Sequence, residues 1–174
     1  LYAGAVNVPL SIKLGETNDL VFRVKHSDSK YIITSKFQLA KIRAVLPECP
    51  MVEKVIIFDE VADKRENEIY IDEIMAMGDE FLAKNEEQFI QRYKSIGPDD
   101  YANISYTSGT TADPKGILLT HRNYTANVEQ AHSVIGVGPE DRMLIILPLD
   151  HCFAHVAGFY TMMSYGASLG MVPS

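Results

Sequence analysis

The chain is poor in the residues that mark several classes of protein. It contains no tryptophan and two cysteines in 174 residues, and Cys49 and Cys152 lie too far apart for a metal-binding or redox motif. Because disulfides form mainly in oxidising compartments, this cysteine usage predicts no disulfide and a cytoplasmic location. No run of apolar residues reaches the length of about 20 that crosses a membrane, so no transmembrane segment is expected.

Positive charge is also scarce. The chain has 16 Lys and Arg residues against 23 Asp and Glu residues, a formal net charge of −7, and no basic cluster interrupts this balance. A broad nucleic-acid-binding surface is therefore excluded, and no nucleic-acid partner is expected. The remaining composition, 47% hydrophobic and 22% charged, is ordinary for a globular protein, and the length suffices for one domain with a core.

Both ends of the sequence have the composition of a protein interior. Leu1–Val6 begins inside an apolar run, and Ala167–Ser174 stops where a buried strand is expected to finish. Natural termini are usually polar and frayed. We therefore expect residues 1–174 to be a single fragment cut from a larger domain. Such a fragment would expose an unpaired strand edge, through which two copies could form a dimer.

Short apolar or β-branched runs alternate with helical patterns along the chain. Strands with little polar alternation, separated by helices, predict an α/β fold with layers: a mostly parallel sheet flanked by helices. The expected strands are Val6–Pro9, Tyr31–Thr34, Lys54–Phe58, Ala102–Tyr106, Ile117–Leu119, Met143–Leu147 and Leu169–Val172. The expected helices are Thr17–His26, Lys36–Leu46, Asp72–Tyr93, Asn123–Ile135 and Phe153–Tyr165.

Two further features concern organisation. Residues from about 59 to 91 are polar and acidic, which predicts an exposed excursion whose helix breaks around Lys84 and Asn85. A faint internal similarity links Tyr2–Pro9 with Tyr165–Pro173, since both read as a helix end, a Gly-Ala turn and a strand closing on proline. This similarity hints at two related α/β halves.

The most informative segment is Tyr106–Gly116, which follows a strand-like run. Residues 107–111 carry four hydroxyl side chains around Gly109, and Lys115 follows a proline. Glycine lets backbone N–H groups turn toward an anion, hydroxyls add neutral donors, and lysine supplies a point charge. The segment therefore predicts a polyphosphate-binding loop. A Ser/Thr-rich connection between two strands is the alternative, and the Walker A and Gly-x-Gly-x-x-Gly patterns are both absent.

This loop, continued by Ile117–Asn123, resembles the phosphate-loop signature of the adenylate-forming enzymes. The family pattern is Tyr/Phe-Thr-Ser-Gly-Thr-Thr-Gly-x-Pro-Lys-Gly, followed by Thr-His. One position departs from it, because Ala112 stands where the family usually has glycine. If that position requires a positive φ, alanine costs about 1 kcal/mol or more.

Two other segments carry the same resemblance. Leu147–Phe153 is similar to the Leu-Pro-Leu-x-His-x-Phe block of acyl-CoA synthetases, and Tyr2–Leu10 is similar to the family's early helix–strand unit. In that family the histidine, here His151, lies beside the carboxylate and the adenylate, and the next helix lines the acyl pocket. Many long-chain synthetases carry glutamate after the phenylalanine, whereas this chain has Ala154.

The resemblance implies a fragment of the N-terminal domain of an acyl-CoA synthetase, such as a long-chain fatty acid–CoA ligase. It implies a small carboxylic acid as substrate, with ATP, Mg²⁺ and coenzyme A. The residues that it assigns to the ATP phosphates are Thr107, Ser108, Gly109, Thr110, Thr111 and Lys115, with Mg²⁺ near Thr110 or Thr111. The family's later motifs for adenine, ribose, metal and the catalytic lysine are absent, which predicts that this fragment alone is inactive.

Several alternatives stay open at this point. Within the superfamily, aryl-CoA ligases and peptide-synthetase adenylation domains compete, and a non-catalytic nucleotide-binding module belongs to a different class. Gly166–Gly170 matches the Gly-x-Ser-x-Gly nucleophile elbow of hydrolases, although the expected order there is helix before strand. His151 and His155 have the i, i+4 spacing of zinc ligands, but no glutamate or third ligand accompanies them, so zinc is not expected.

Overall fold

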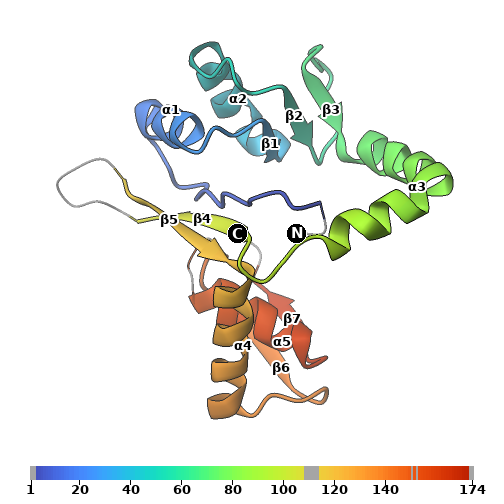
Figure 1. The fold of residues 1–174 in the computed structure, drawn as a ribbon. Coiled ribbons are helices and arrows are strands. Elements are labelled where there is room, and N and C mark those ends of the chain that lie inside the picture. Colours follow the sequence, from blue (N-terminus) through green and yellow to red (C-terminus); the bar gives the residue numbers. More distant parts are fainter. Residues whose placement is uncertain (1–2, 108–113, 150, 152, 173–174) are drawn as a thin grey trace.

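The computed structural model describes residues 3–107, 114–149, 151 and 153–172 (Figure 1). Seven strands, five α-helices, a 3₁₀ turn η1 and a π-helical segment η2 are found in these residues. Their bounds in chain order are α1 Thr17–His26, β1 Tyr31–Thr34, α2 Lys36–Val45, η1 Leu46–Glu48, β2 Lys54–Ile57, β3 Glu68–Tyr70, α3 Ile71–Lys94, β4 Tyr101–Tyr106, β5 Gly116–Thr120, α4 His121–Ile135, β6 Arg142–Ile145, η2 Ala154–Tyr160, α5 Thr161–Ser164 and β7 Ser168–Met171.

The described strands form three small sheets. Strands β1, β2 and β3 are parallel, β6 and β7 are parallel, and β4 and β5 are antiparallel. The expected α/β class with parallel strands and flanking helices is confirmed, although the strands do not join one continuous sheet. The antiparallel pair follows from its short connection, because parallel neighbours need a crossover of a dozen or more residues.

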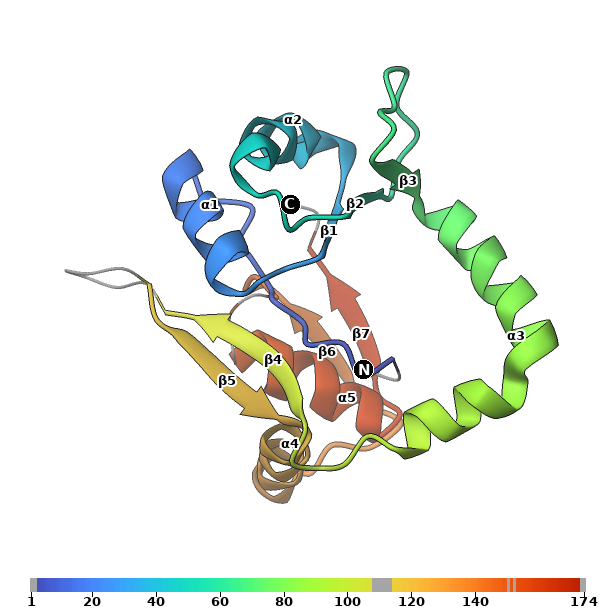
Figure 2. The ribbon, with the colours of Figure 1, turned by 45° about the horizontal axis from the view of Figure 1, so that its top comes forward.

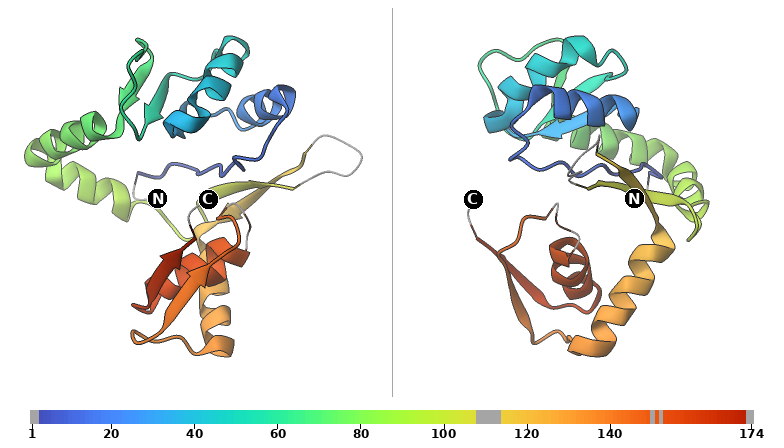
Figure 3. Two further views of the ribbon diagram at one scale, coloured as in Figure 1. Left: turned by 180° about the vertical axis from the view of Figure 1, so that it is seen from behind. Right: turned by 90° about the vertical axis from the view of Figure 1, so that its left-hand side faces the viewer.

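Two groups of elements lie on opposite sides of the β4–β5 hairpin. Helices α1 and α2 with the β1–β3 sheet lie on one side of it, and α4, α5, β6 and β7 lie on the other (Figure 1). Figure 3 shows both groups from two further sides, with the hairpin between them. No helix among the described residues is long and apolar enough to cross a membrane.

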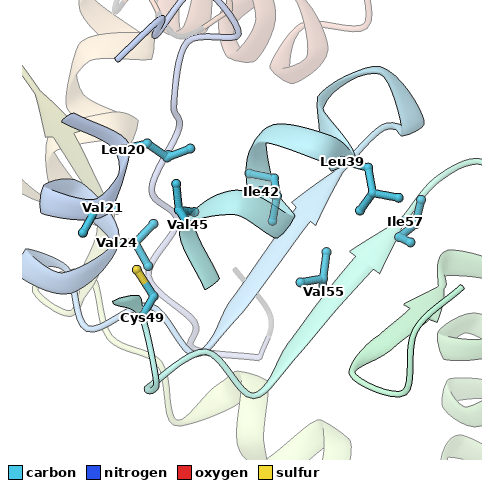
Figure 4. Packing of buried hydrophobic residues seen from close by; sticks show 9 residues of the cluster. All are labelled: Leu20, Val21, Val24, Leu39, Ile42, Val45, Cys49, Val55 and Ile57. Carbon is cyan, nitrogen blue, oxygen red and sulfur yellow. The ribbon is translucent and has the colours of Figure 1, made fainter. Parts of the chain in front are cut away.

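The core of the first group consists of nine buried residues from α1, α2, β2 and the turn after η1. In Figure 4 these side chains converge between the two helices and the strand. Spacings of one, three and four residues place the apolar side chains on one face of each helix. Each fully buried aliphatic side chain contributes about 1.5–3 kcal/mol. The residues are Leu20, Val21, Val24, Leu39, Ile42, Val45, Cys49, Val55 and Ile57.

The first expected strand is reduced to one bridge. Asn7 donates its N–H to Ala102 O at 2.9 Å and accepts from Ile104 N–H at 2.8 Å, which forms a parallel bridge to Asn103. The strand prediction for residues 6–9 was therefore wrong. Proline has no N–H to donate, so Pro9 cannot extend the ladder.

The acidic segment contains the short strand β3, which was not expected, and most of α3. The helix bends at Asn85, whose φ of −139° and ψ of 31° lie outside the helical region. The Asn85 side chain donates to Phe81 O at 3.0 Å and so replaces part of the backbone ladder there. The predicted break is confirmed. Figure 2 shows α3 as a bent arm, and none of its residues is buried.

The two glycines of the internal similarity have the same backbone conformation. Gly4 has a φ of +71° and Gly166 a φ of +72°, a region that favours glycine. Each precedes a segment in parallel pairing, Asn7 with Asn103 in one case and β7 with β6 in the other. The similarity noticed in the sequence therefore extends to the local geometry.

A buried ion pair holds β3 against α2. Arg43 donates to both carboxylate oxygens of Glu68, at 2.6 and 2.8 Å, and the Glu68 side chain is fully buried. Arg43 also bonds the Asp63 carboxylate at 2.6 Å, and the Arg65 N–H donates to Glu68 at 2.9 Å. The hydrogen bond from Arg43 is the main cause that lowers the pKa of Glu68 below its ordinary value of 4.5.

We expect Glu68→Gln to lower the free energy of unfolding at pH 7 by roughly 2 kcal/mol, as for the loss of a hydrogen bond to a charged group. Because the folded pKa of Glu68 is lowered, the stability from this carboxylate is present above pH 4.5 and is lost as the pH falls further. Urea unfolding at pH 7, 4.5 and 3 should therefore show the difference between wild type and variant shrinking with acid. Glu66→Gln, at an exposed neighbour, is the matched control. A difference that is constant with pH would contradict the assignment.

Candidate functional site

The loop singled out in the sequence closes the β4–β5 hairpin. Tyr106 pairs with Gly116, and Thr107 N–H donates to Lys115 O at 3.1 Å. Thr107 and Lys115 are therefore neighbours across the mouth of the loop, and both are exposed. The other predicted phosphate ligands, Ser108, Gly109, Thr110 and Thr111, lie outside the described residues, as does Ala112.

The mouth of the loop rests on the end of α1 through Tyr106. The Tyr106 hydroxyl lies 2.8 Å from His26 Nδ1 and 3.4 Å from Arg23 O. The Arg23 guanidinium lies 5.5 Å from the centre of the tyrosine ring. Burial is the main cause that raises the pKa of Tyr106. The hydroxyl therefore stays protonated at neutral pH and can act as a hydrogen-bond donor.

Gly116 is required on the opposite strand because the contact leaves little room. A Cβ atom on this residue would lie 3.0 Å from Ile104 Cγ2, 3.3 Å from Tyr106 Cε1 and 3.4 Å from His26 Cε1. The last glycine of the signature thus lets the tyrosine and histidine rings pack over the strand. Its role in this structure is one of packing, since its φ is not in the left-handed region.

The Thr-His pair after the loop begins helix α4. Thr120 is the N-cap, since its hydroxyl accepts from Asn123 N–H at 3.3 Å while Asn123 Oδ1 accepts from Thr120 N–H at 2.9 Å. The next residue, His121, donates its backbone N–H to Asp100 O, and its buried Nε2 has no hydrogen-bond partner among the described residues. Since β5 ends at Thr120 and α4 begins at His121, the hairpin continues directly into the helix.

His151 is exposed and has local hydrogen-bond partners. Its N–H donates to Pro148 O at 2.9 Å, and its Nδ1 accepts from Phe153 N–H at 3.3 Å. Because Nδ1 is an acceptor, the neutral ring carries its proton on Nε2, which is then a donor for a ligand. These contacts orient the ring but do not join it to Thr107 or Lys115.

Helix η2, which follows His151, packs through a cluster of aromatic rings. His155 stacks on Tyr160 with ring centres 4.9 Å apart, and Tyr124 of α4 contacts both. Burial lowers the pKa of His155, so this ring is neutral at pH 7. His155 thus packs as an aromatic ring, and the part of the chain that the structure describes contains no cluster of three metal-ligating side chains.

A cavity of about 1360 Å³ lies between the two groups of elements, and its wall does not include Thr107, Lys115 or His151. It is therefore not the predicted phosphate site. Its wall includes residues of β1, β4, α4 and η2, and much of the lining is aliphatic or aromatic. The lining includes the polar and aromatic residues Asn103, His121, Tyr124 and Tyr160.

The hydrolase alternative does not agree with the fold. A nucleophile elbow places its serine on a turn from a strand into a helix. Here Ser168 is the first residue of β7 and comes after α5 and the Gly166 turn. The segment is a turn from a helix into a strand, as the sequence order indicated.

His26 and Arg23, which contact Tyr106, belong to no motif of the sequence. Each lies about 80 positions before Tyr106 in the sequence, and no spacing or motif links them. Both residues belong to the last turn of α1. A helix prediction from the sequence gives this position but says nothing of their contacts. Their contact with the loop arises from tertiary packing.

We expect Gly116→Ala to destabilise the protein by about 1–3 kcal/mol, because the added methyl group overpacks the Tyr106–His26 contact. Gly78→Ala is the matched control. Gly78 lies inside α3 with no atom near its would-be side chain, so alanine there should stabilise the helix by about 0.5–1 kcal/mol. Thermal unfolding should show a lower melting temperature for Gly116→Ala and a higher one for Gly78→Ala than for the wild type. Equal effects would refute the close-packing role of Gly116.

Comparison with known proteins identifies the family of the chain. The family described as AMP-binding enzyme matches residues 1–174. Long-chain-fatty-acid–CoA ligase 4 of Saccharomyces cerevisiae is 33% identical over 160 residues, which cover 80% of this chain and 23% of the yeast protein. Chalcone synthase cfoA of Aspergillus candidus is 32% identical over 170 residues, covering 95% of this chain and 6% of that protein. The chain thus spans a quarter or less of these relatives.

Solved structures share the fold. The anthranilate CoA ligase AuaEII, in complex with anthranoyl-AMP, superposes with a TM-score of 0.77 at 19% identity, over 98% of this chain and 31% of that one. The inhibitor-bound N-terminal domain of FACL13 from Mycobacterium tuberculosis gives a TM-score of 0.71 at 25% identity, over 99% and 39%. Because the family model matches residues 1–174, and the signature of Tyr106–Gly116 agrees with it, this chain belongs to the AMP-binding enzyme family of adenylate-forming proteins.

Proposed function

We propose that the chain is part of the N-terminal domain of an acid–thiol ligase that activates a fatty acid. In the first half-reaction a carboxylate oxygen attacks the α-phosphorus of ATP, the bond to pyrophosphate breaks, and an acyl-adenylate forms. In the second, the thiol sulfur of coenzyme A attacks the acyl carbon, AMP leaves and the thiol proton is released. Catalysis of such transfers rests mainly on positioning and on stabilisation of charge.

The observation that carries the proposal is the hairpin loop with its signature. The mouth is closed by the Thr107–Lys115 hydrogen bond, so a cation and a hydroxyl donor face solvent at the same point. We assign the phosphates of ATP to Thr107, the hydroxyl and glycine positions 108–111, and Lys115. Mg²⁺ would arrive with ATP and neutralise phosphate charge near Thr110 or Thr111.

The proposed acid side of the site begins at His151. Its Nε2 is a donor on an exposed ring, which suits a carboxylate or an adenylate phosphate. The wall of the cavity does not include His151, but its many aliphatic side chains and Tyr160 would suit the apolar part of an acid. The similarity to a yeast long-chain-fatty-acid–CoA ligase points to the same substrate class.

An aromatic acid is the second candidate. The ligase AuaEII, which shares the fold, is named for anthranilate, and aromatic rings of Tyr124 and Tyr160 line the cavity of this chain. Fatty and aromatic acids differ in length and shape, so a panel of acids separates the two candidates.

We further propose that residues 1–174 alone do not form the adenylate. The family's adenine, ribose and lysine motifs are absent from this sequence. Residues 1–174 alone would therefore contact only the phosphates of ATP and would bind the nucleotide weakly. A cytoplasmic location and dimerisation through an unpaired strand edge remain predictions from the sequence.

ATP–pyrophosphate exchange by the full-length protein, scanned over fatty and aromatic acids, tests the function. Exchange that depends on a long-chain acid would support the proposal, and exchange with aromatic acids alone would favour the second candidate. Absence of exchange with every acid would refute a carboxylate-activating enzyme. The same assay on residues 1–174 should give no exchange.

In the full-length protein, Lys115→Ala should raise the KM for ATP about tenfold, the equivalent of about 1.4 kcal/mol, because one charge-assisted contact to phosphate is lost. The KM for the acid should stay unchanged. Lys84→Ala, which removes an exposed lysine of α3 far from the hairpin loop, is the matched control. An unchanged KM for ATP would contradict the role given to Lys115.

His151→Ala should give the opposite pattern, with the KM for the acid raised about threefold to tenfold by loss of a donor to the carboxylate. The KM for ATP should change little, because no contact links His151 with Thr107 or Lys115. Initial rates at varied acid and varied ATP separate the two effects. A change in the ATP constant alone would remove His151 from the acid side.

A further inference from the structure

We propose that His26 is a positioning residue for the two described ends of the phosphate loop, Thr107 and Lys115, acting through the hydroxyl of Tyr106. The positioning rests on geometry within the described residues. Its consequence for ATP binding rests on the proposed function. No motif of the loop contains His26, which lies at the last position of α1.

The Tyr106 hydroxyl has two side-chain hydrogen-bonding neighbours at the end of α1, His26 and Ser27. His26 Nδ1 lies 2.8 Å from this oxygen, whereas Arg23 O lies 3.4 Å away, beyond the usual range for O–H···O bonds. A tyrosine hydroxyl has one proton to donate. In either tautomer of the histidine one of the two groups donates and the other accepts, so the pair is satisfied.

The position of His26 gives it leverage on both strands of the hairpin. Tyr106 precedes Thr107, and Gly116 follows Lys115, so the two pairs flank the mouth of the loop. The imidazole contacts the Tyr106 ring edge-on, with ring centres 5.7 Å apart. Its Cε1 lies close to the place where a Cβ atom on Gly116 would be. A shift of this ring would therefore move both ends of the loop.

His26 is itself held by the core of the first group. Its ring stacks on Phe22 with centres 5.3 Å apart, and α1 is anchored by Leu20, Val21 and Val24. The neighbouring Arg23 is engaged by Asp19 at 3.2 Å. A continuous set of contacts thus runs from the core through α1 and His26 to Tyr106 and the loop.

A positioning role of His26 and a purely stabilising role predict different changes in the protection of backbone amides from hydrogen exchange. A residue that only stabilises the fold would change all protected amides together. A positioning residue should change the Thr107 N–H, which bonds Lys115 O, and leave the Val55 N–H, which bonds Asn67 O in the first group, unchanged. Hydrogen exchange reads these two amides separately.

The first experiment measures hydrogen exchange in the full-length protein with three variants. His26→Leu keeps bulk and loses the bond, His26→Asn places an amide near the former Nδ1, and Tyr106→Phe removes the hydroxyl. We expect His26→Leu and Tyr106→Phe to lower the protection of Thr107 N–H about threefold, as for one exposed hydrogen bond. His26→Asn should restore it, and the double variant His26→Leu/Tyr106→Phe should equal either single one.

His132→Asn is the matched control, because it removes another stacked histidine, which packs on Tyr165 away from the loop. It should leave the Thr107 amide unchanged. Unchanged Thr107 protection in His26→Leu, or equal protection in His26→Leu and His26→Asn, would overturn the inference. A parallel loss at Thr107 and Val55 would do so as well, since it would indicate general destabilisation.

The second experiment measures the KM for ATP and the KM for the acid in the same variants. His26→Leu should raise the first about threefold with the second unchanged, and His26→Asn should restore it. If the wild-type protein shows no pyrophosphate exchange with any of the acids, the proposed function fails. The hydrogen-exchange result then still decides whether His26 is a positioning residue. If exchange is active but the KM for ATP is unaffected by His26→Leu, the link from position to nucleotide binding is refuted.

Discussion

The arrangement of the site depends on one contact, in which Tyr106 at the end of β4 packs against the end of α1 and over Gly116. The hydroxyl bonds His26, the ring lies near the Arg23 guanidinium, and the absence of a side chain at Gly116 makes the approach close. The ends of the phosphate loop are held by groups that lie outside its motif.

The same contact connects the loop to the rest of the molecule. On one side α1 carries the apolar face that forms the core with α2 and β2. On the other side β5 continues into α4, whose first turn is capped by Thr120. The hairpin is therefore fixed between two packed groups, and its antiparallel pairing is compatible with the short connection between β4 and β5. The parallel strands β1–β3 and β6–β7 remain on either side.

The charges of the chain are arranged around this framework. The acidic segment is mostly the exposed arm α3, yet it contributes one buried carboxylate, Glu68, which Arg43 pairs on two oxygens. A charge without a partner at that depth would be costly, so the pairing with Arg43 is a condition for β3 to lie against α2. The prediction of an exposed segment from its acidic composition is therefore correct for most of its residues and wrong for Glu68.

The sequence by itself determined the α/β class, most helix and strand positions, the break at Asn85 and the family, because these follow from local periodicity and from a contiguous signature. Only the tertiary structure decided that the strands form three sheets, that residues 6–9 make one bridge, and that Tyr106 bonds His26. The physical reason is range. Hydrogen bonding within a helix and the spacing of apolar side chains depend on neighbours a few residues away. The partner of a tyrosine hydroxyl 80 residues distant depends on how whole elements pack, which no local pattern encodes.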